Sequence, residues 1–500
     1  MSIQVITAQA NRQPLAKASV DIGCNDLDIK GNGILADLSC FRALQAAALT
    51  MPDLIILVVP GEDLLAPGAA TSRLTALGLM RVAALELATQ NVRCHAISCG
   101  DPKDQAIVED LVHALAANHS LPSGQVFACA NGHLEILSQP RPVRVSSRTT
   151  GDWSFDEIDT VARDFWHLAS MPSEAHDKPA GTLAGKVAIV TGGGGGIGRA
   201  ICHGFARMGA RVVVNDIGAV MSGETSGEDP ATLIAREIME AGGQALADSG
   251  NVASEADNIT LLQNTLSAFG RLDILVNSAG IIRMAPLAEM TEDEWSSVLD
   301  VNLYGPARLS HMCAEAMIRT GGGSFVHLTS ASGLIGSIGQ ANYAASKLGL
   351  TGLSRELVAI WGEQGIRSNC LAPSSTSRMT EMTDNSRRAE LGEAAFARLK
   401  QSRAASMPKR IVPLIAWLAS DRAQDITGQV FGARASDMYL YNQHGPVRSL
   451  SLAEVGDNRQ SCIAAWLDGA AQTAATPLEK ITDVFDWSPV MPTVASEEKE

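Results

Sequence analysis

Five consecutive glycines, Gly192 to Gly196, constrain the fold of this 500-residue chain more than any other feature of its sequence. The preceding "KVAIV" has the length and composition of a buried strand, and the following "RAICHGFARMGA" has apolar residues at helical spacing. A floppy linker would not be wedged between two such elements, so the glycines are expected to form a strand-to-helix turn. At such a turn, backbone N–H groups and the positive end of the helix can approach a pyrophosphate closely. The feature predicts an α/β fold with a Rossmann-like, doubly wound parallel sheet.

A carboxylate follows at the distance that such a fold requires. "RVVVND" predicts a second strand that ends at Asp216, 18 residues after Gly198. A carboxylate at this place can accept hydrogen bonds from the adenosine ribose hydroxyls and would repel a 2′-phosphate. The glycine run contains no Arg or Lys before Gly198. The sequence therefore favours NAD over NADP as the cofactor.

The residues that carry chemistry are expected downstream of this turn. "GGSFVHLTSASG" predicts a strand that ends in a hydroxyl cluster containing Ser330, and Tyr343 follows Ser330 by 13 residues. Lys347 lies four residues after Tyr343, so a helix would place the ammonium beside the phenol and favour its ionised form. Tyr343 could then act as general acid or base on a hydroxyl or carbonyl group. A Tyr and a Lys at this spacing usually mark only a helix face, but together with the glycine turn, the "NSAG" loop and Ser330 they indicate a catalytic site.

Together these motifs resemble the short-chain dehydrogenase/reductase family, over residues 181 to about 435. The resemblance implies a catalytic tetrad of Asn302, Ser330, Tyr343 and Lys347. In it, Ser330 would polarise the substrate oxygen, Lys347 would hold the ribose, and Asn302 would position a proton-relay water. It also implies a set of residues that bind the cofactor: Gly192, Gly196, Ile197, Gly198, Asp216, Asn251, Val252, Asn277, Ala279, Gly280, Tyr343, Lys347 and Pro373.

Two short sequence segments indicate a particular subgroup of this family. "VVVNDIG" and "APSSTSRMT", in which Ser374 replaces the family's common glycine after Pro373, are similar to the hydroxyacyl-CoA dehydrogenase domain of multifunctional β-oxidation enzymes. The expected reaction is the interconversion of 3-hydroxyacyl-CoA and 3-ketoacyl-CoA. The alternatives are a hydroxysteroid dehydrogenase, an NADH-dependent 3-ketoacyl-ACP reductase, or a scaffold protein that retained a dehydrogenase fold. A basic stretch at 377–410, with eight Lys or Arg against four Asp or Glu, is expected to contact the CoA phosphates or else to be a solvated helix face.

One 21-residue segment occurs in two similar copies in the chain. Residues 124–144 and 428–448 are identical at eight of 21 positions, from "GQVF" to "PVR". This repeat predicts a tandem of two Rossmann-like copies: residues 1–170 as a degenerate copy without a cofactor site, and residues 186–435 as the catalytic domain. Residues 171–185 are expected to be a linker and 436–500 a C-terminal extension. High-molecular-weight 3-ketoacyl reductases are similar in this architecture; the alternative is an unrelated α/β domain with an accidental match.

Composition excludes several other classes of function. The net charge of −15 argues against binding to nucleic acid or to an anionic membrane, and no apolar run is long enough to span a bilayer. Nine cysteines occur without the spacing of metal ligands, and no signal peptide is visible, so we expect no metal site and a cytoplasmic protein. The first copy would act as a built-in partner subunit. We therefore expect a homodimer, a pseudo-tetramer of dehydrogenase folds, that acts on a small molecule, an acyl-CoA thioester or a steroid.

Overall fold

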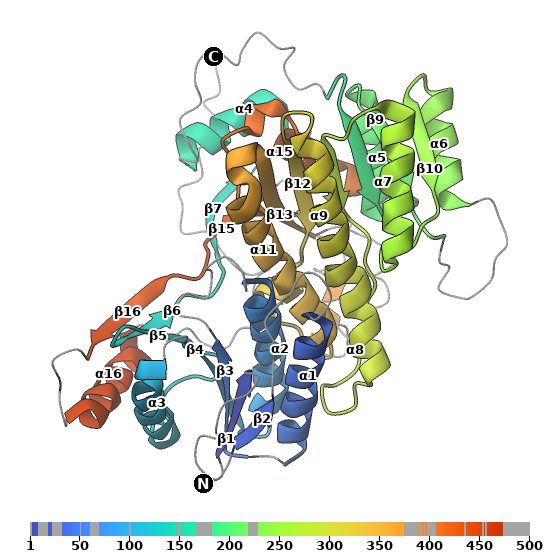
Figure 1. The fold of residues 1–500 in the computed structure, drawn as a ribbon. Coiled ribbons are helices and arrows are strands. Elements are labelled where there is room, and N and C mark those ends of the chain that lie inside the picture. Colours follow the sequence, from blue (N-terminus) through green and yellow to red (C-terminus); the bar gives the residue numbers. More distant parts are fainter. Residues whose placement is uncertain are drawn as a thin grey trace.

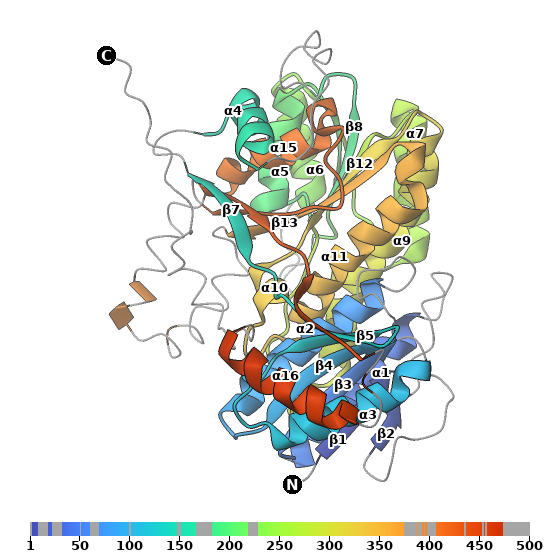
Figure 2. The ribbon, with the colours of Figure 1, turned by 90° about the vertical axis from the view of Figure 1, so that its left-hand side faces the viewer.

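The computed structural model contains two α/β units that pack against each other through helices (Figures 1 and 2). It describes residues 3–8, 19–22, 33–50, 52–60, 70–99, 102–147, 152–166, 183–218, 229–374, 388, 393–394, 396–397, 407–434, 437–452, 455 and 458–473. Each unit is built on one sheet with helices on both faces. The α/β architecture predicted from the sequence is confirmed.

The second unit holds the larger sheet, with the strand order β10-β9-β8-β11-β12-β13-β14-β15-β7. Its strands are β7 (Pro142–Ser147), β8 (Val187–Thr191), β9 (Arg211–Asn215), β10 (Gln244–Asp248), β11 (Ile274–Asn277), β12 (Gly323–Leu328), β13 (Ile366–Ser374), β14 (Val430–Arg434) and β15 (Asp437–Tyr441). The strands from β10 to β14 are parallel, because crossover helices join them, and β15 and β7 add antiparallel pairs. Strand β14 is therefore not the edge of this sheet.

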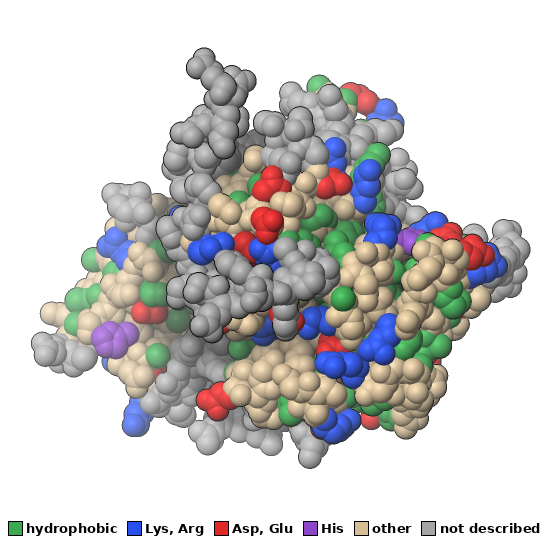
Figure 3. Space-filling view, turned by 90° about the horizontal axis from the view of Figure 1, so that it is seen from above, with side chains coloured by type: hydrophobic (Ala, Val, Ile, Leu, Met, Phe, Trp, Pro, Cys, Tyr) green, Lys and Arg blue, Asp and Glu red, His purple; other side chains and the backbone are tan. Residues whose placement is uncertain are grey.

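Helices cover both faces of this sheet. The outer face carries α4 (Phe155–Thr160), α5 (Gly196–Arg207), α6 (Pro230–Glu240) and α15 (Val412–Ala419). The face toward the first unit carries α7 (Glu255–Phe269), α8 (Glu292–Leu299), α9 (Gly305–Ile318), the short α10 (Ala331–Ile335) and α11 (Ala341–Trp361). No described helix has both the length and the apolar composition that crossing a membrane requires. On the face seen in Figure 3, the described basic and acidic side chains are interspersed.

The first unit holds a smaller sheet, with the order β16-β6-β5-β4-β3-β1-β2. Its strands are β1 (Ile3–Ala8), β2 (Ser19–Ile22), β3 (Leu54–Pro60), β4 (Arg93–Cys99), β5 (Val126–Ala130), β6 (His133–Leu137) and β16 (Pro446–Ser451). Its helices are α1 (Gly33–Thr50), α2 (Ala70–Ala88), α3 (Gln105–Ala117) and α16 (Arg459–Thr473). The pair α1 and α2 faces the second unit, whereas α3 and α16 cover the opposite face of the sheet.

The repeated endings exchange strands between the units. Strand β7 leaves the first unit and pairs with β15 in the second sheet, and β16 leaves the second unit and pairs with β6 in the first. Where the two segments cross, Asn442 N donates to Arg141 O at 2.9 Å and Ser138 N donates to Gly445 O at 2.8 Å. Each visiting strand covers a sheet edge that would otherwise expose unpaired backbone groups.

This exchange corrects the domain boundaries. Residues 142–147 and 152–166 lie with the second sheet, and residues 446–452 and 458–473 lie with the first, so the boundary expected at residue 170 does not divide the chain between the sheets. The segment expected to be a C-terminal extension supplies β15 to one sheet and β16 to the other. The sequence repeat indicated that the two endings are equivalent but carried no information about which sheet each would join.

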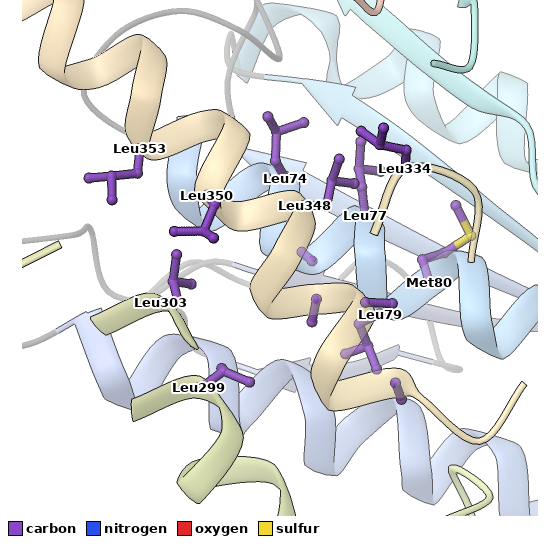
Figure 4. Packing of buried hydrophobic residues seen from close by; sticks show 14 of the residues in the cluster. Leu74, Leu77, Leu79, Met80, Leu299, Leu303, Leu334, Leu348, Leu350 and Leu353 are labelled. Atoms are coloured by element: carbon purple, nitrogen blue, oxygen red, sulfur yellow. The ribbon is translucent and has the colours of Figure 1, made fainter. Parts of the chain in front are cut away.

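The contact between the units centres on α2 and α11, whose side chains belong to one continuous apolar cluster (Figure 4). Glycines allow the two backbones to come close. A Cβ on Gly78 would lie 2.6 Å from Ala344 O, and one on Gly352 would lie 2.5 Å from Ala70 O. Beside them, Phe41 of α1 stacks on Trp295 of α8 with the ring centroids 4.6 Å apart. Burial of this surface is the main apolar contribution to joining the units.

Candidate active site

The glycine run forms the expected turn between β8 and α5. Gly192 and Gly196 have φ angles of +66° and +52°, a region that side-chain-bearing residues rarely adopt. A Cβ on Gly198 would lie 2.0 Å from Gly192 O, so the first turn of α5 packs directly on the loop. At Gly196, by contrast, an added Cβ would meet no atom within 4 Å. The N-terminus of α5 thus faces open space without a side-chain cap, which fits a bound pyrophosphate.

Asp216 lies directly beside this turn, after β9. Its carboxylate accepts hydrogen bonds from Gly194 N at 3.0 Å and from Gly218 N at 2.9 Å. The first cation after the glycines, Arg199, is directed to α6, where it donates to Glu237 at 2.9 Å. Asp216 is therefore the charged side chain that lies against the glycine turn, whereas Arg199 is directed away from it.

The other residues expected at the cofactor line the carboxyl edge of the sheet. Asn251 is exposed after β10, and Val252 is buried with its carbonyl bound to Asn258. Ala279 N donates to the hydroxyl of Thr191 at 3.1 Å, which fastens the "NSAG" loop to the glycine turn. The sequence analysis missed this role of Thr191, although its place just before the glycines was a usable signal.

Asn277 and Pro373 occupy strand ends. Asn277 is buried and donates to Ser310 Oγ and to His327 Nδ1, both at 3.0 Å, so it ties β11 to α9 and β12. Pro373 lies near the end of β13, opposite Ala433 of β14. Ile197 is half-buried and packs on the core beneath α5.

Tyr343 and Lys347 lie one turn apart on α11. The Lys347 ammonium is 5.7 Å from the centroid of the Tyr343 ring and donates to Leu328 O at 2.9 Å. Burial lowers the pKa of Lys347 to about 8. Tyr343 is nearly buried among Ile282 and Val298, which come from the loop after β11 and from α8.

Asn302 and Ser330 are brought to the same region. Asn302 lies in a π-helical turn at Asp300–Tyr304, between α8 and α9. Its side chain binds both main-chain groups of Ile281, accepting from N at 2.8 Å and donating to O at 2.9 Å. A Cβ on Gly280 would be 3.3 Å from Asn302 Oδ1 and 3.5 Å from Lys347 Nζ. Asn302, Lys347 and the "NSAG" loop therefore converge, and π-helical turns are frequent at functional sites.

Ser330 forms the N-cap of α10, where its hydroxyl accepts from Ser332 N at 3.2 Å. The short helix packs on α11, since a Cβ on Gly333 would lie 2.9 Å from Lys347 Cβ. Ser330 and Lys347 are thus held by adjoining elements. Within the described part of the chain, no cluster of three His, Cys, Asp or Glu side chains could hold a metal ion.

The basic stretch expected to contact CoA lies almost entirely outside the described residues. Within 377–410, only 388, 393–394, 396–397 and 407–410 are described. Arg388 is exposed and donates to Glu393 at 2.7 Å. The role expected of this stretch stays a prediction.

Comparison with known proteins agrees with this geometry. A family model described as short chain dehydrogenase matches residues 186–391. The chain is 35% identical over 270 residues to the peroxisomal multifunctional enzyme type 2 of Drosophila melanogaster, covering 54% of this chain and 42% of that protein. It is 36% identical over 257 residues to a hydroxyacyl-CoA dehydrogenase of Mycobacterium tuberculosis, covering 50% of this chain and 77% of that protein.

A third relative is the 3-oxoacyl-[acyl-carrier-protein] reductase of Synechocystis, 34% identical over 250 residues that cover 50% of this chain and 95% of that protein. The chain spans between a quarter and about half the length of the multifunctional relatives that it matches. The single-domain relatives, in contrast, are matched over most of their length. With the glycine turn, the Tyr343–Lys347 pair and these similarities in place, the chain belongs to the short-chain dehydrogenase/reductase family.

Proposed function

We propose that this protein is an NAD(H)-dependent dehydrogenase that interconverts 3-hydroxyacyl-CoA and 3-ketoacyl-CoA. The observation that carries the proposal is the convergence of Asn302, Tyr343 and Lys347 beside the "NSAG" loop and the glycine turn. The substrate class rests on relatives whose names specify hydroxyacyl-CoA dehydrogenase or peroxisomal hydratase-dehydrogenase-epimerase activity.

Each side chain has a role that follows from its place. The nicotinamide, when bound, supplies or accepts the hydride. The Tyr343 hydroxyl donates a proton to the carbonyl oxygen during reduction and accepts one from the alcohol during oxidation. The nearby Lys347 ammonium stabilises the phenolate that reduction leaves behind, and the Ser330 hydroxyl orients the substrate oxygen. Asn302 fixes the backbone of Ile281 beside the reacting groups.

The preference for NAD follows from Asp216. Its carboxylate lies at the turn where the adenosine ribose is expected, and Arg199 is paired with Glu237 rather than directed there. Asp216→Ala should therefore raise the KM for NADH about tenfold and relax the discrimination against NADPH, because about 1–3 kcal/mol of charge-assisted hydrogen bonding is lost. The NADH/NADPH ratio of kcat/KM measures this, and the KM for the ketone serves as the control. An unchanged ratio would remove Asp216 from ribose recognition.

A scaffold without catalysis is the second function class. Lys347 argues against it, because a buried ammonium costs folding free energy that a scaffold has no reason to incur. Mixing the protein with NADH and a panel of 3-ketoacyl-CoA, 3-ketoacyl-ACP, free ketone and steroid substrates, and following absorbance at 340 nm, separates the classes. Turnover fastest with acyl-CoA supports the proposal. NADH binding without turnover of any ketone contradicts it.

We also propose that the first unit is a degenerate copy of the second. The support is the run β5, β6 and β7, which repeats at the same spacing as β14, β15 and β16, together with a shared Leu-Gly-Leu triplet at Gly78 and Gly349 in the facing helices. Both triplets lie at the contact between α2 and α11. In this view, the two units of one chain correspond to the two subunits of a dimer of this family.

A further inference from the structure

Glu86 of the first unit reaches the active-site side of the second. It lies near the end of α2, and its two carboxylate oxygens accept separate backbone hydrogen bonds. Oε2 accepts from Leu287 N at 2.7 Å, and Oε1 accepts from Gly339 N at 2.8 Å. Both donors belong to the second unit, more than 200 residues away in the sequence.

These two donors stand on the loops that flank Tyr343. Leu287 lies in the loop between β11 and α8, the same loop that places Ile282 and Met284 against the tyrosine. Gly339 lies in the loop before α11, next to its N-cap residue Gln340. The loops join each other directly, because Ala285 N donates to Gly339 O at 3.1 Å and Ala285 forms a bridge with Gln340. Glu86 therefore binds the joint between two loops that border the reacting tyrosine.

Two further side chains of the first unit bind the backbone of the same region. Arg81 of α2 donates to Leu334 O at 2.5 Å, at the end of the helix that Ser330 begins. Gln45 of α1 donates to Leu287 O at 3.0 Å and to Met290 O at 2.8 Å. The first unit thus contacts both ends of the α10–α11 connection and the second half of the loop between β11 and α8.

We propose that Glu86 is a positioning residue for the dehydrogenase reaction: it holds the two loops beside Tyr343 in the arrangement that accepts the substrate. This inference rests on the proposed function. A carboxylate suits the task because it only accepts hydrogen bonds, so each oxygen can take one N–H. A glutamine offers one carbonyl oxygen and one NH₂ group, and the NH₂ would face a backbone donor.

The same helix pair offers a matched control. Glu356 of α11 is a buried carboxylate that points the other way, accepting from Thr71 N at 3.1 Å and from Thr71 Oγ1 at 2.6 Å. Its partner, Thr71, lies in the first turn of α2 and belongs to neither loop. Glu356→Gln therefore disturbs a buried carboxylate between the same helices without touching the active-site loops.

The test compares Glu86→Gln and Glu356→Gln in the full chain. Both variants should lower the melting temperature. Only Glu86→Gln should lower kcat/KM for 3-ketoacyl-CoA, by about tenfold and mainly through a higher KM. The reason is that the glutamine NH₂ would face the backbone N–H of Leu287 or of Gly339, and the repulsion between two donors would displace that loop. The NADH dissociation constant, measured by fluorescence, should stay within about twofold in both variants, since the cofactor turn is not contacted.

Equal losses of kcat/KM in the two variants would reduce Glu86 to a general structural contact and overturn the proposal. If Glu86→Gln does not fold, Gln45→Ala removes a side-chain donor to the same loop and should raise KM to a smaller extent; an unchanged KM in that variant also counts against the proposal. If the intact protein turns over no ketone, the proposed function fails on its own. Amide hydrogen exchange then decides the positioning role: faster exchange at Leu287 and Gly339 in Glu86→Gln alone supports it, and equal exchange in both variants contradicts it.

Discussion

The two units are alike where they face each other and different where a dinucleotide would bind. In the second unit, β8, β9 and β10 extend the sheet beyond β11, and the glycine turn joins β8 to α5. In the first unit, β1 and β2 extend the sheet beyond β3, and the described residues form no strand beyond β2. The shared elements bury apolar surface between the units, whereas the differing elements of the second unit form the side of the site where the dinucleotide is expected. The second unit carries the proposed catalytic residues, and the first unit packs an apolar helix face against it.

The facing helices show the same difference at single positions. When the Leu-Gly-Leu triplets of α2 and α11 are matched, Tyr343 corresponds to Ser72 and Lys347 to Ala76. Two polar side chains that α2 carries toward the second unit, Arg81 and Glu86, bind backbone groups next to α11 and in the loop after β11. Helix α2, which lacks the Tyr and Lys of α11, thus binds the segments that lie next to the proposed catalytic residues.

Removing the first unit should have the largest effect on solubility and activity. Deletion of residues 1–175 exposes the apolar side of α11, removes β7 from the second sheet and leaves β16 without its partner β6. We expect an aggregated or inactive product, because exposed apolar surface of this extent drives association. Size-exclusion chromatography and NADH oxidation measure the outcome.

A cut chain is the control for this deletion. A protease site placed within 171–185, once cleaved, leaves both units and both exchanged strands present. The two fragments should co-elute and retain activity. A soluble, fully active deletion product would show that the first unit is an appendage with another role.

Substitution of Tyr343, the proposed proton donor, should have the next largest effect, a fall in kcat. Tyr343→Phe keeps the ring that packs on Ile282 and Val298 but removes the proton donor. The kcat should fall by about 10²–10⁴, the range for loss of a general acid–base group, with NADH binding retained. Ser72→Ala, at the matched position of α2, should leave kcat unchanged. Turnover near the native rate in Tyr343→Phe would contradict the catalytic assignment.

The sequence predicted the second unit well because its signals are local. The glycine turn joins adjacent elements, and Tyr343 and Lys347 lie on one helix face at a spacing of four residues. The resemblance supplied Asn302, whose side chain acts through Ile281, 21 residues away in the sequence. The roles of these residues in catalysis stay predictions until the variants are measured.

The contacts between the units could not be predicted in this way. Glu86 binds Gly339 across 253 residues, and Arg81 binds Leu334 across 253 residues, so no local periodicity indicates either pair. The strand exchange was hidden for a related reason. An antiparallel strand such as β7 could form the same backbone hydrogen bonds at the edge of either sheet. Which sheet it joins depends on how the two units are placed relative to each other.

Adding a side chain where α2 and α11 touch is a third way to test the comparison, because it would force the two helices apart. Gly78→Val adds a side chain whose Cβ alone would lie 2.6 Å from Ala344 O, and backbone on both helices leaves it no room. Overpacking of this kind should lower the free energy of unfolding by about 1–3 kcal/mol. Gly362→Ala, after the end of α11, is the control, because its Cβ would meet only Val358 Cγ1 at 3.5 Å. Equal urea midpoints for both variants would mean that the units do not need this close approach.

The smallest expected effect concerns the buried ammonium that distinguishes α11 from α2. Burial lowers the pKa of Lys347 to about 8, so the folded protein binds its proton less tightly than the unfolded chain does. The ammonium therefore destabilises the fold fully below pH 8, and this cost disappears as pH rises from about 8 toward the unfolded value of about 10.4. Lys347→Met, which makes this position apolar as Ala76 is in α2, should gain on the order of 1–2 kcal/mol at pH 7.

The same variant should lose turnover, because the phenolate of Tyr343 is no longer stabilised. Its advantage in stability over the unmodified protein should shrink between pH 8 and about 10.4, since only the unmodified protein gains stability there. Urea unfolding at pH 7 and at pH 9.5 measures the gain in stability and its decrease with pH. A Lys347→Met protein that is less stable than the unmodified chain at pH 7 would show that the ammonium holds the fold together through Leu328 rather than being kept there for catalysis.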